Sequence, residues 1–230
     1  RDTSNSNQGE YVYATPSANG EALTFTTPAV FYEDAVSGIG QSISAVYDPD
    51  SEKAVVAYRK PNLAGAAKTI FNDPGGKVKA ISETAISQAA GTQVEFGGTS
   101  YNVDISAAYD SANQKVVVAF SDYGNSTYGT ARVGTVNSSD NSISFGTAVV
   151  YESATTFENA VAYDVNAGKI VIAYMDFSNS KYGTAIIGTV SGTGISFGTP
   201  VVFRSAEVRD THMVYDSTAQ KDRKSTRLNS

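Results

Sequence analysis

The chain has 230 residues, with 20 glycines, 14 tyrosines, no cysteine and a formal net charge of −6. The absence of cysteine excludes disulfide bridges and thiol chemistry, and the acidic balance disfavours nucleic-acid binding, which depends on clustered Lys and Arg. Because no stretch approaches the ~18 consecutive apolar residues of a membrane span, we predict no membrane insertion.

The N-terminal part of the chain divides into a polar segment and two strand-like segments. Residues 1–10 are polar and are predicted to be disordered. Tyr11–Ala14 and Ala22–Tyr32 match the third and fourth strand-like segments of a repeat that fills the rest of the chain. We therefore predict a partial repeat over residues 11–42.

A tyrosine–aspartate pair marks each copy of this repeat. The aspartates are separated by 62, 54 and 52 residues, and a lysine stands five residues after each one. The first three lysines are followed by apolar segments, and a YGTA segment and an SFGT segment recur later in the repeat. Each repeat thus holds four strand-like segments. The aspartates are Asp48, Asp110, Asp164 and Asp216.

The repeat boundaries follow from these segments. We predict complete repeats at residues 43–104, 105–157 and 158–209 and a truncated one at 210–221, called repeats 1 to 4 below. In repeat 1, an insertion at Pro61–Gly76 is predicted to lengthen the connection between the second and third strands. The last nine residues, Asp222–Ser230, read DRKSTRLNS and resemble a translated sequencing adapter, so we predict a non-native tail.

The repeat length and strand count predict the fold class. Four strands per ~50 residues are typical of a β-propeller blade. The first strands are rich in Ala and Ser, which suits a crowded position near an axis, and the second strands are continuously apolar, which suits cover on both faces. We therefore predict an all-β fold, β-propeller-like with tandem four-stranded blades, present as an incomplete fragment. The longer connections, from strand two to three and from strand four to the next repeat, would share one face.

The connections after the second strands hold the first group of candidate binding residues. Aromatic rings beside Asp and Asn are typical of sugar-binding surfaces, where rings stack and polar side chains bond hydroxyl groups. Alternatively, the Asp and Asn only make turns and the tyrosines only fill space between repeats. The group consists of Asp122, Tyr123, Asn125, Tyr128, Asp176, Phe177, Asn179 and Tyr182.

Acidic residues recur five positions before the first-strand tyrosines. They are Asp104, Glu158 and Asp210, with Ser42 at the same position of repeat 1. Such residues would ring the mouth of a central channel and could bind a cation or a basic partner, or they are solvated loop acids. The single histidine, His212, has no paired nucleophile. We predict no catalytic residue, no metal and no cofactor.

The SFGT, AYD…K and NS…YGTA…GTV patterns together resemble tandem blades of uncharacterised surface and tail-associated proteins of marine bacteria and their viruses. The resemblance covers about residues 11–221 and implies a propeller at an extracellular, cell-surface or virion location. We expect a binding or adhesion module that recognises a glycan or a cell-surface protein through the variable loops. The alternatives are a carbohydrate-active enzyme, a glycoside hydrolase or lyase whose carboxylates are the three recurring acids, and a structural spacer.

Overall fold

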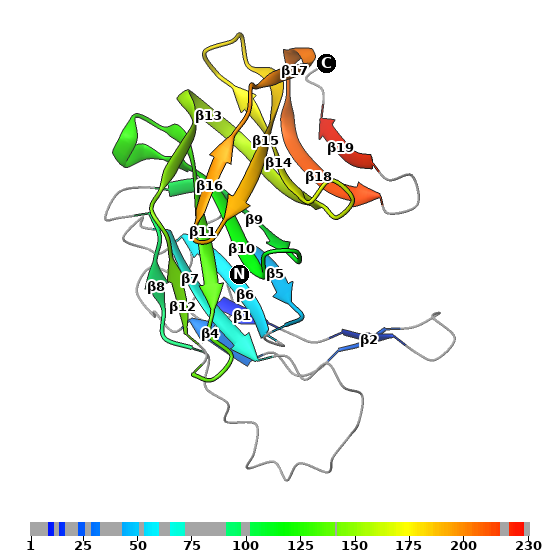
Figure 1. The fold of residues 1–230 in the computed structure, drawn as a ribbon. Coiled ribbons are helices and arrows are strands. Elements are labelled where there is room, and N and C mark those ends of the chain that lie inside the picture. The colour runs from blue at the N-terminus through cyan, green and yellow to red at the C-terminus, as the bar shows by residue number, and fades with distance from the viewer. Residues whose placement is uncertain are drawn as a thin grey trace. The chain divides into compact units, whose positions relative to one another are not determined.

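The protein is described here by a computed structural model. It describes residues 9–11, 14–16, 23–25, 29–32, 43–50, 53–59, 65–71, 91–97, 102–140, 142–216 and 221–227. These residues form antiparallel β-strands with one 3₁₀ turn, η2, at Tyr123–Asn125 (Figure 1). The predicted all-β class is confirmed, whereas closure of the repeats into a propeller stays a prediction. Within the described ranges, no helix has the length and apolarity needed to cross a membrane.

The chain forms two compact units, residues 1–40 and 41–230. In the first unit, β1 (Gly9–Tyr11) pairs with β4 (Ala29–Tyr32), and β2 (Ala14–Pro16) pairs with β3 (Leu23–Phe25). The predicted disordered segment 1–10 lies outside the described residues, except for the first two residues of β1.

Repeat 1 is a four-stranded antiparallel sheet whose strands follow in chain order. The predicted insertion at Pro61–Gly76 instead contains the third strand, because Gly65–Phe71 pairs along its whole length with the second strand. The connection between the second and third strands is therefore short, and the extra residues of repeat 1 follow the third strand. The strands are β5 (Ile43–Asp48), β6 (Lys53–Arg59), β7 (Gly65–Phe71) and β8 (Val94–Glu95).

Repeats 2 and 3 share one long strand, β13 (Val149–Asp164). Its first half pairs with the third strand of repeat 2, and its second half pairs with the second strand of repeat 3. The chain therefore stays extended where a connection between repeats was predicted. The other strands are β9 (Asn102–Asp110), β10 (Lys115–Asp122), β11 (Tyr128–Val136), β12 (Ile143–Phe145), β14 (Lys169–Asp176), β15 (Tyr182–Ser191), β16 (Gly194–Phe197) and β17 (Val201–Glu207).

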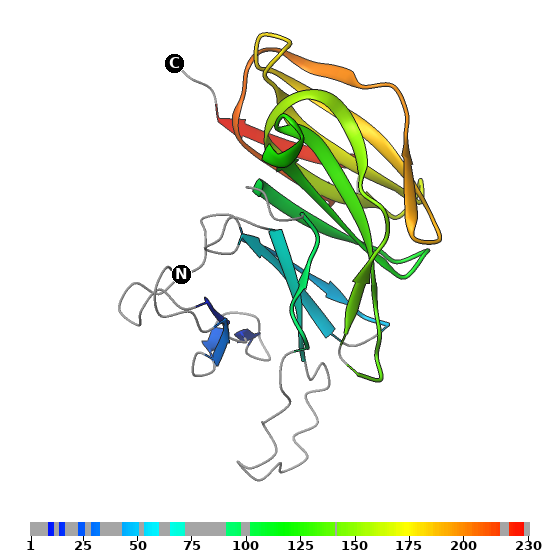
Figure 2. The same ribbon diagram turned by 90° about the vertical axis from the view of Figure 1, so that its left-hand side faces the viewer.

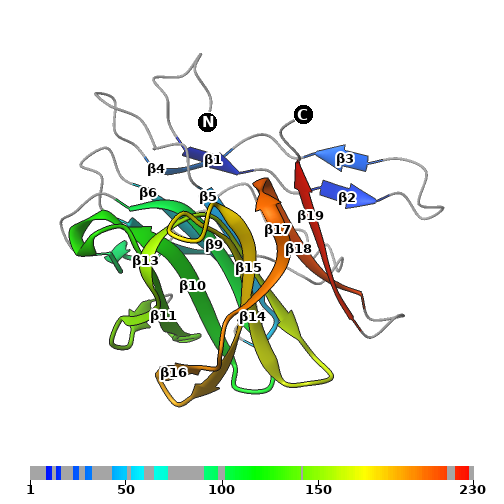
Figure 3. The ribbon, with the colours of Figure 1, turned by 90° about the horizontal axis from the view of Figure 1, so that it is seen from above.

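Repeat 4 is represented by β18 (Arg209–Asp216), which pairs with β19 (Lys221–Arg227). Their register is that of the first two strands of repeat 2: Tyr215 faces Asp222 as Tyr109 faces Val116. Figure 3 shows β18 alongside the yellow strands of repeat 3. The predicted non-native tail, Asp222–Ser230, thus supplies most of β19.

The hydrophobic cores lie between consecutive repeats, because the strands of each repeat are apolar on both faces. Figure 2 shows the cyan, green and yellow-to-orange strands of repeats 1, 2 and 3 as successive layers. The core between repeats 1 and 2 contains Val55, Ala57, Ala67, Phe96, Ile105, Val116, Val118, Phe120 and Ile143. The core between repeats 2 and 3 contains Ala108, Val117, Ala119, Ala131, Val133, Tyr151, Val161, Ile170, Ile172, Tyr174, Ile186, Val190 and Ile195.

The tyrosine–aspartate signature has a structural explanation. Asp48, Asp110 and Asp164 each end a first strand and close the following turn. The Asp110 carboxylate, for example, accepts hydrogen bonds from the amides of Ala112 and Asn113, both at 3.0 Å. The preceding tyrosine reaches back to the turn of the previous repeat, where the Tyr109 hydroxyl donates to the Asp50 carboxylate. The signature therefore makes a turn and joins neighbouring repeats.

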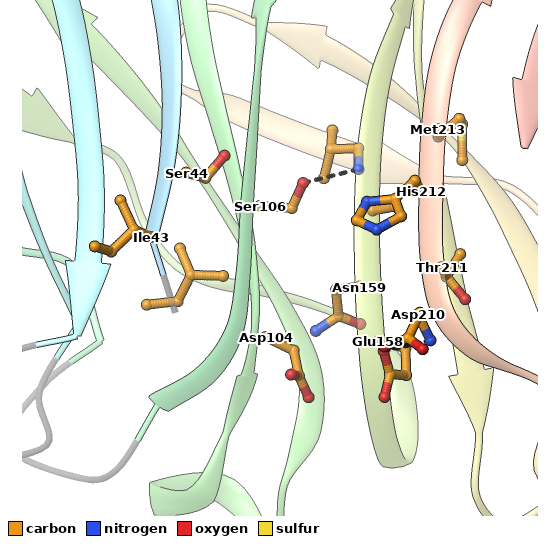
Figure 4. A pocket seen from close by; sticks show the side chains of 13 residues that line it. Ile43, Ser44, Asp104, Ser106, Glu158, Asn159, Asp210, Thr211, His212 and Met213 are labelled. Carbon is orange, nitrogen blue, oxygen red and sulfur yellow. Dashed lines mark hydrogen bonds between the residues drawn. The ribbon is translucent and has the colours of Figure 1, made fainter. Parts of the chain in front are cut away.

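The four first strands, β5, β9, β13 and β18, lie side by side in this order (Figure 4). Serine hydroxyls connect two pairs of them: Ser44 accepts from the amide of Ala107 at 2.9 Å, and Ser106 accepts from the amide of Val161 at 3.1 Å. This row of strands positions the acidic residues predicted at the channel mouth.

Candidate functional site

The loops after β10 and β14 are built in the same way. The Asp122 carboxylate accepts from the amide of Gly124 at 2.9 Å, and the Asp176 carboxylate accepts from the amide of Asn179 at 3.1 Å. Because each carboxylate closes its own turn, the turn-making interpretation explains both aspartates. In each turn, the residue after the aspartate, Tyr123 or Phe177, is exposed.

Tyr123 and Phe177 are exposed aromatic side chains at equivalent positions of repeats 2 and 3. Their exposed fractions are 44% and 49%. Phe177 meets Phe157 edge-on, with ring centroids 6.0 Å apart, and the Lys181 ammonium lies 5.4 Å from its ring centroid. Partly exposed aromatic rings are common in ligand-binding grooves, so Tyr123 and Phe177 mark a candidate binding surface.

Both rings line a cleft of about 390 Å³. The remaining lining comes from residues at or beside the three recurring acids, from the end of β14 and from the loop after it. The cleft is lined by Val103, Asp104, Tyr123, Phe157, Glu158, Met175, Phe177, Lys181 and Arg209. Residues from the two predicted groups, loop aromatics and recurring acids, therefore lie in one cleft.

The other loop candidates do not line this cleft. Tyr128 and Tyr182 begin β11 and β15 and are half-buried in the sheets, opposite Thr155 and Glu207. Asn125 and Asn179 are exposed in the turns. For these four residues the geometry agrees with the packing and turn interpretation.

The recurring acids lie within strands, at irregularities of β9, β13 and β18, and not in loops as one interpretation predicted. Asp104, Glu158 and Asp210 all have the left-handed backbone conformation, with φ of 51°, 57° and 49°. This conformation is uncommon for residues other than Gly, Asn and Asp, and a β-bulge accommodates it. Ser42 lies outside the described residues.

The first two acids each bond the backbone of the next acid along the row. The Glu158 carboxylate accepts from the amide of Asp210 at 2.9 Å, and the Asp104 carboxylate accepts from the amide of Glu158. Figure 4 shows the three side chains at one end of a second cleft, of about 350 Å³, lined by the first strands. The acids therefore join neighbouring repeats and also line open space.

Burial controls the protonation of Asp104. Burial is the main cause that raises its pKa above 3.8, and the negative charge of Glu158 raises it further, whereas the hydrogen bond from the Glu158 amide and the charge of Arg59 lower it. The pKa of Asp122 is also raised by burial, against the amide bonds of its turn. The cleft thus contains one carboxyl group that takes up a proton more readily than an exposed aspartate.

Two basic residues of the cleft were not singled out from the sequence. Lys181 and Arg209 both pair with Glu207, at 3.5 and 2.7 Å. Lys181 stands where repeat 2 has Thr127, and Arg209 stands where the two preceding copies have Val103 and Phe157, so neither belongs to the repeat pattern. Only their position beside predicted residues, Tyr182 and Asp210, could have drawn attention to them.

The described residues show no geometry for a resident metal ion. They contain no group of three or more His, Asp or Glu side chains arranged to hold one. His212 lines the second cleft beside Thr211 and Met213.

No protein-family model matches the chain, and no curated protein matches it in sequence.

Proposed function

We propose that this protein is a carbohydrate-binding module of propeller type, displayed outside the cell or on a virion. The observation that carries the proposal is the pair of exposed rings, Tyr123 and Phe177, which neighbouring repeats present at the rim of one polar cleft. The resemblance of the repeat to blades of bacterial and viral surface proteins supports the location.

The chemistry of the cleft favours a sugar over a charged macromolecule. Exposed rings offer faces for the C–H groups of a pyranose, while carboxylate, ammonium and guanidinium groups bond its hydroxyls. The lining carries charges of both signs: Asp104 and Glu158 are acidic, and Lys181 and Arg209, which also pair with Glu207, are basic. A neutral, hydroxyl-rich ligand suits such a lining better than a polyanion or a strongly basic peptide.

A microarray of bacterial and algal polysaccharides tests the proposal. We expect binding of the full chain to at least one neutral polysaccharide, weakened about 2- to 10-fold by Tyr123→Ala or Phe177→Ala, since an aromatic contact contributes about 0.5–1.5 kcal/mol. Val165→Ala, a change at a 54% exposed residue in a tight turn away from the cleft, is the matched control. A blank array, or equal loss in the control, would favour the spacer interpretation.

The second candidate function is polysaccharide cleavage, and the raised pKa of Asp104 favours it. Glycoside hydrolysis needs one protonated and one ionised carboxyl group around the bond that breaks. Asp104 would donate the proton, and Glu158 would act as base or nucleophile. Release of reducing ends from an array-positive polysaccharide, abolished by Asp104→Asn and by Glu158→Gln, is the expected result; binding without release would exclude cleavage of that polysaccharide.

A further inference from the structure

The face of repeat 3 that points away from repeat 2 exposes large apolar side chains. Ile187 on β15 is 54% exposed, and Val201 on β17 is 64% exposed. Val171 pairs with Ile187 across the ladder, and Ala185 pairs with Val201, so the four side chains form one patch, here called the repeat 3 patch.

The same positions of repeat 2 are covered. Val133, the equivalent of Ile187, is 1% exposed, and Val117 and Ala131, the equivalents of Val171 and Ala185, are fully buried. Repeat 3 packs on these residues, and its second strand, β14, contributes Ile170, Ile172 and Tyr174 to the shared core. The packing of repeat 3 on repeat 2 therefore shows which kind of structure fits the repeat 3 patch.

The first strand of a further repeat, β18, already lies on repeat 3. β18 contacts both β13 and β14, and the Asp210 amide on β18 bonds the Glu158 carboxylate on β13. The second strand, β19, reads KDRKSTR. Its Asp222 and Lys224 occupy the register positions of Val116 and Val118, which face the preceding repeat in the core between repeats 1 and 2.

We propose that the repeat 3 patch is the docking surface for a four-stranded repeat of the same type, whose first strand is β18 and whose second strand is apolar. The continuity of the interface carries this inference: two interfaces of this kind are complete in the molecule, and β18 begins the third. The proposal does not depend on a ligand in the cleft lined by Tyr123 and Phe177.

A chain in which a copy of residues 116–155 replaces residues 222–230 tests the proposal. The added segment supplies strands two to four of repeat 2 directly after Lys221 in the sequence. We expect its Tm to exceed that of the original chain by about 5 °C or more, because the buried patch adds apolar contacts. In a matched control, the copies of Val116, Val118 and Phe120 are replaced by serine, and the gain should vanish.

Ile187→Lys distinguishes docking from unspecific stabilisation. In the original chain it should leave Tm unchanged within about 1 °C, and in the extended chain it should remove most of the gain. Equal effects in both chains, or rapid proteolysis of the added segment, would overturn the proposal. A dimer of the original chain would also overturn the proposal if Ile187→Lys dissociates it and the added segment does not prevent it. The occupant of the patch would then be a second copy of the chain.

Discussion

The junction between repeats 2 and 3 and the junction between repeats 3 and 4 use equivalent positions with different chemistry. At the first, the Tyr151 hydroxyl donates to Asn159 at 2.7 Å, and the Asn159 amide group donates to Ser121 at 3.0 Å. At the second junction, Phe203 takes the place of Tyr151, Thr211 that of Asn159, and Met175 that of Ser121.

The acid–amide bond is kept in both junctions. Asp104 accepts from Glu158, and Glu158 accepts from Asp210. The serine bond is present only in the first, because the equivalent of Ser106 is Ala160. Burial and bonding at a repeat position therefore depend on the neighbouring repeat as much as on the residue itself, and the recurring acids act first as connectors between repeats.

The largest expected difference concerns Val133 and Ile187. Val133→Asp puts a charge into the core between repeats 2 and 3, where it has no partner, so we expect a loss of roughly 3 kcal/mol or more in the free energy of unfolding. Ile187→Asp, at the equivalent exposed position, should change it by less than about 0.5 kcal/mol. Urea titration of both variants measures the difference, and similar losses would contradict the assignment of the two faces.

The buried network of the first junction should give the next largest effect. Tyr151→Phe removes the donor to the buried Asn159 and leaves its oxygen without that bond, which costs about 1–3 kcal/mol. The double variant with Asn159→Thr copies the residues of the second junction and should recover part of the loss, because the unsatisfied oxygen is removed. Strict additivity of the two changes would show that the network is not coupled.

Ser106 is expected to contribute less. Ser106→Ala removes the acceptor of the Val161 amide and should cost about 1 kcal/mol. The reverse change, Ala160→Ser, would offer the same bond to the second junction, and we expect a gain of up to about 1 kcal/mol there. Thermal unfolding of both variants checks the pair, and a destabilising Ala160→Ser would mean that the second junction lacks room for the hydroxyl.

The sequence predicted local features well, because their determinants are close along the chain. The spacing of Asp110 and Lys115 predicted the turn between the first two strands, and these residues face each other across it. The cause of the YGTA glycine is not local, because a Cβ atom on Gly129 would lie 2.4 Å from the ring of Tyr151, which is on the paired strand β13.

Features that arise between repeats were harder to predict. The period placed the recurring acids together, but it could not show that each carboxylate bonds the next backbone amide, since a bulge and a left-handed residue create that geometry. Lys181 and Arg209 belong to the cleft only through the packing of repeats 3 and 4, and no pattern marks them. The third strand of repeat 1 was missed because Gly65–Phe71 lacks the YGTA signature.

The smallest effect should come from the acid–amide bond that both junctions share. Burial raises the pKa of Asp104 in the folded protein above 3.8, so the folded state holds this proton more tightly than the unfolded chain does. Its contribution to stability is therefore fully present below the ordinary pKa and is lost as the pH rises through the folded pKa. Asp104→Asn keeps an oxygen for the Glu158 amide and removes the titration.

We accordingly expect the stability of the wild type, relative to Asp104→Asn, to fall as the pH rises from the ordinary pKa of 3.8 through the raised pKa of Asp104. Urea unfolding of both proteins across this range measures the difference, and the other carboxyl groups cancel because they are common to both. A difference that rises with pH would mean that the amide bond and Arg59 outweigh burial at Asp104. The carboxyl would then act purely as an ionised connector between repeats, and the proton donor proposed for polysaccharide cleavage would be lost with it.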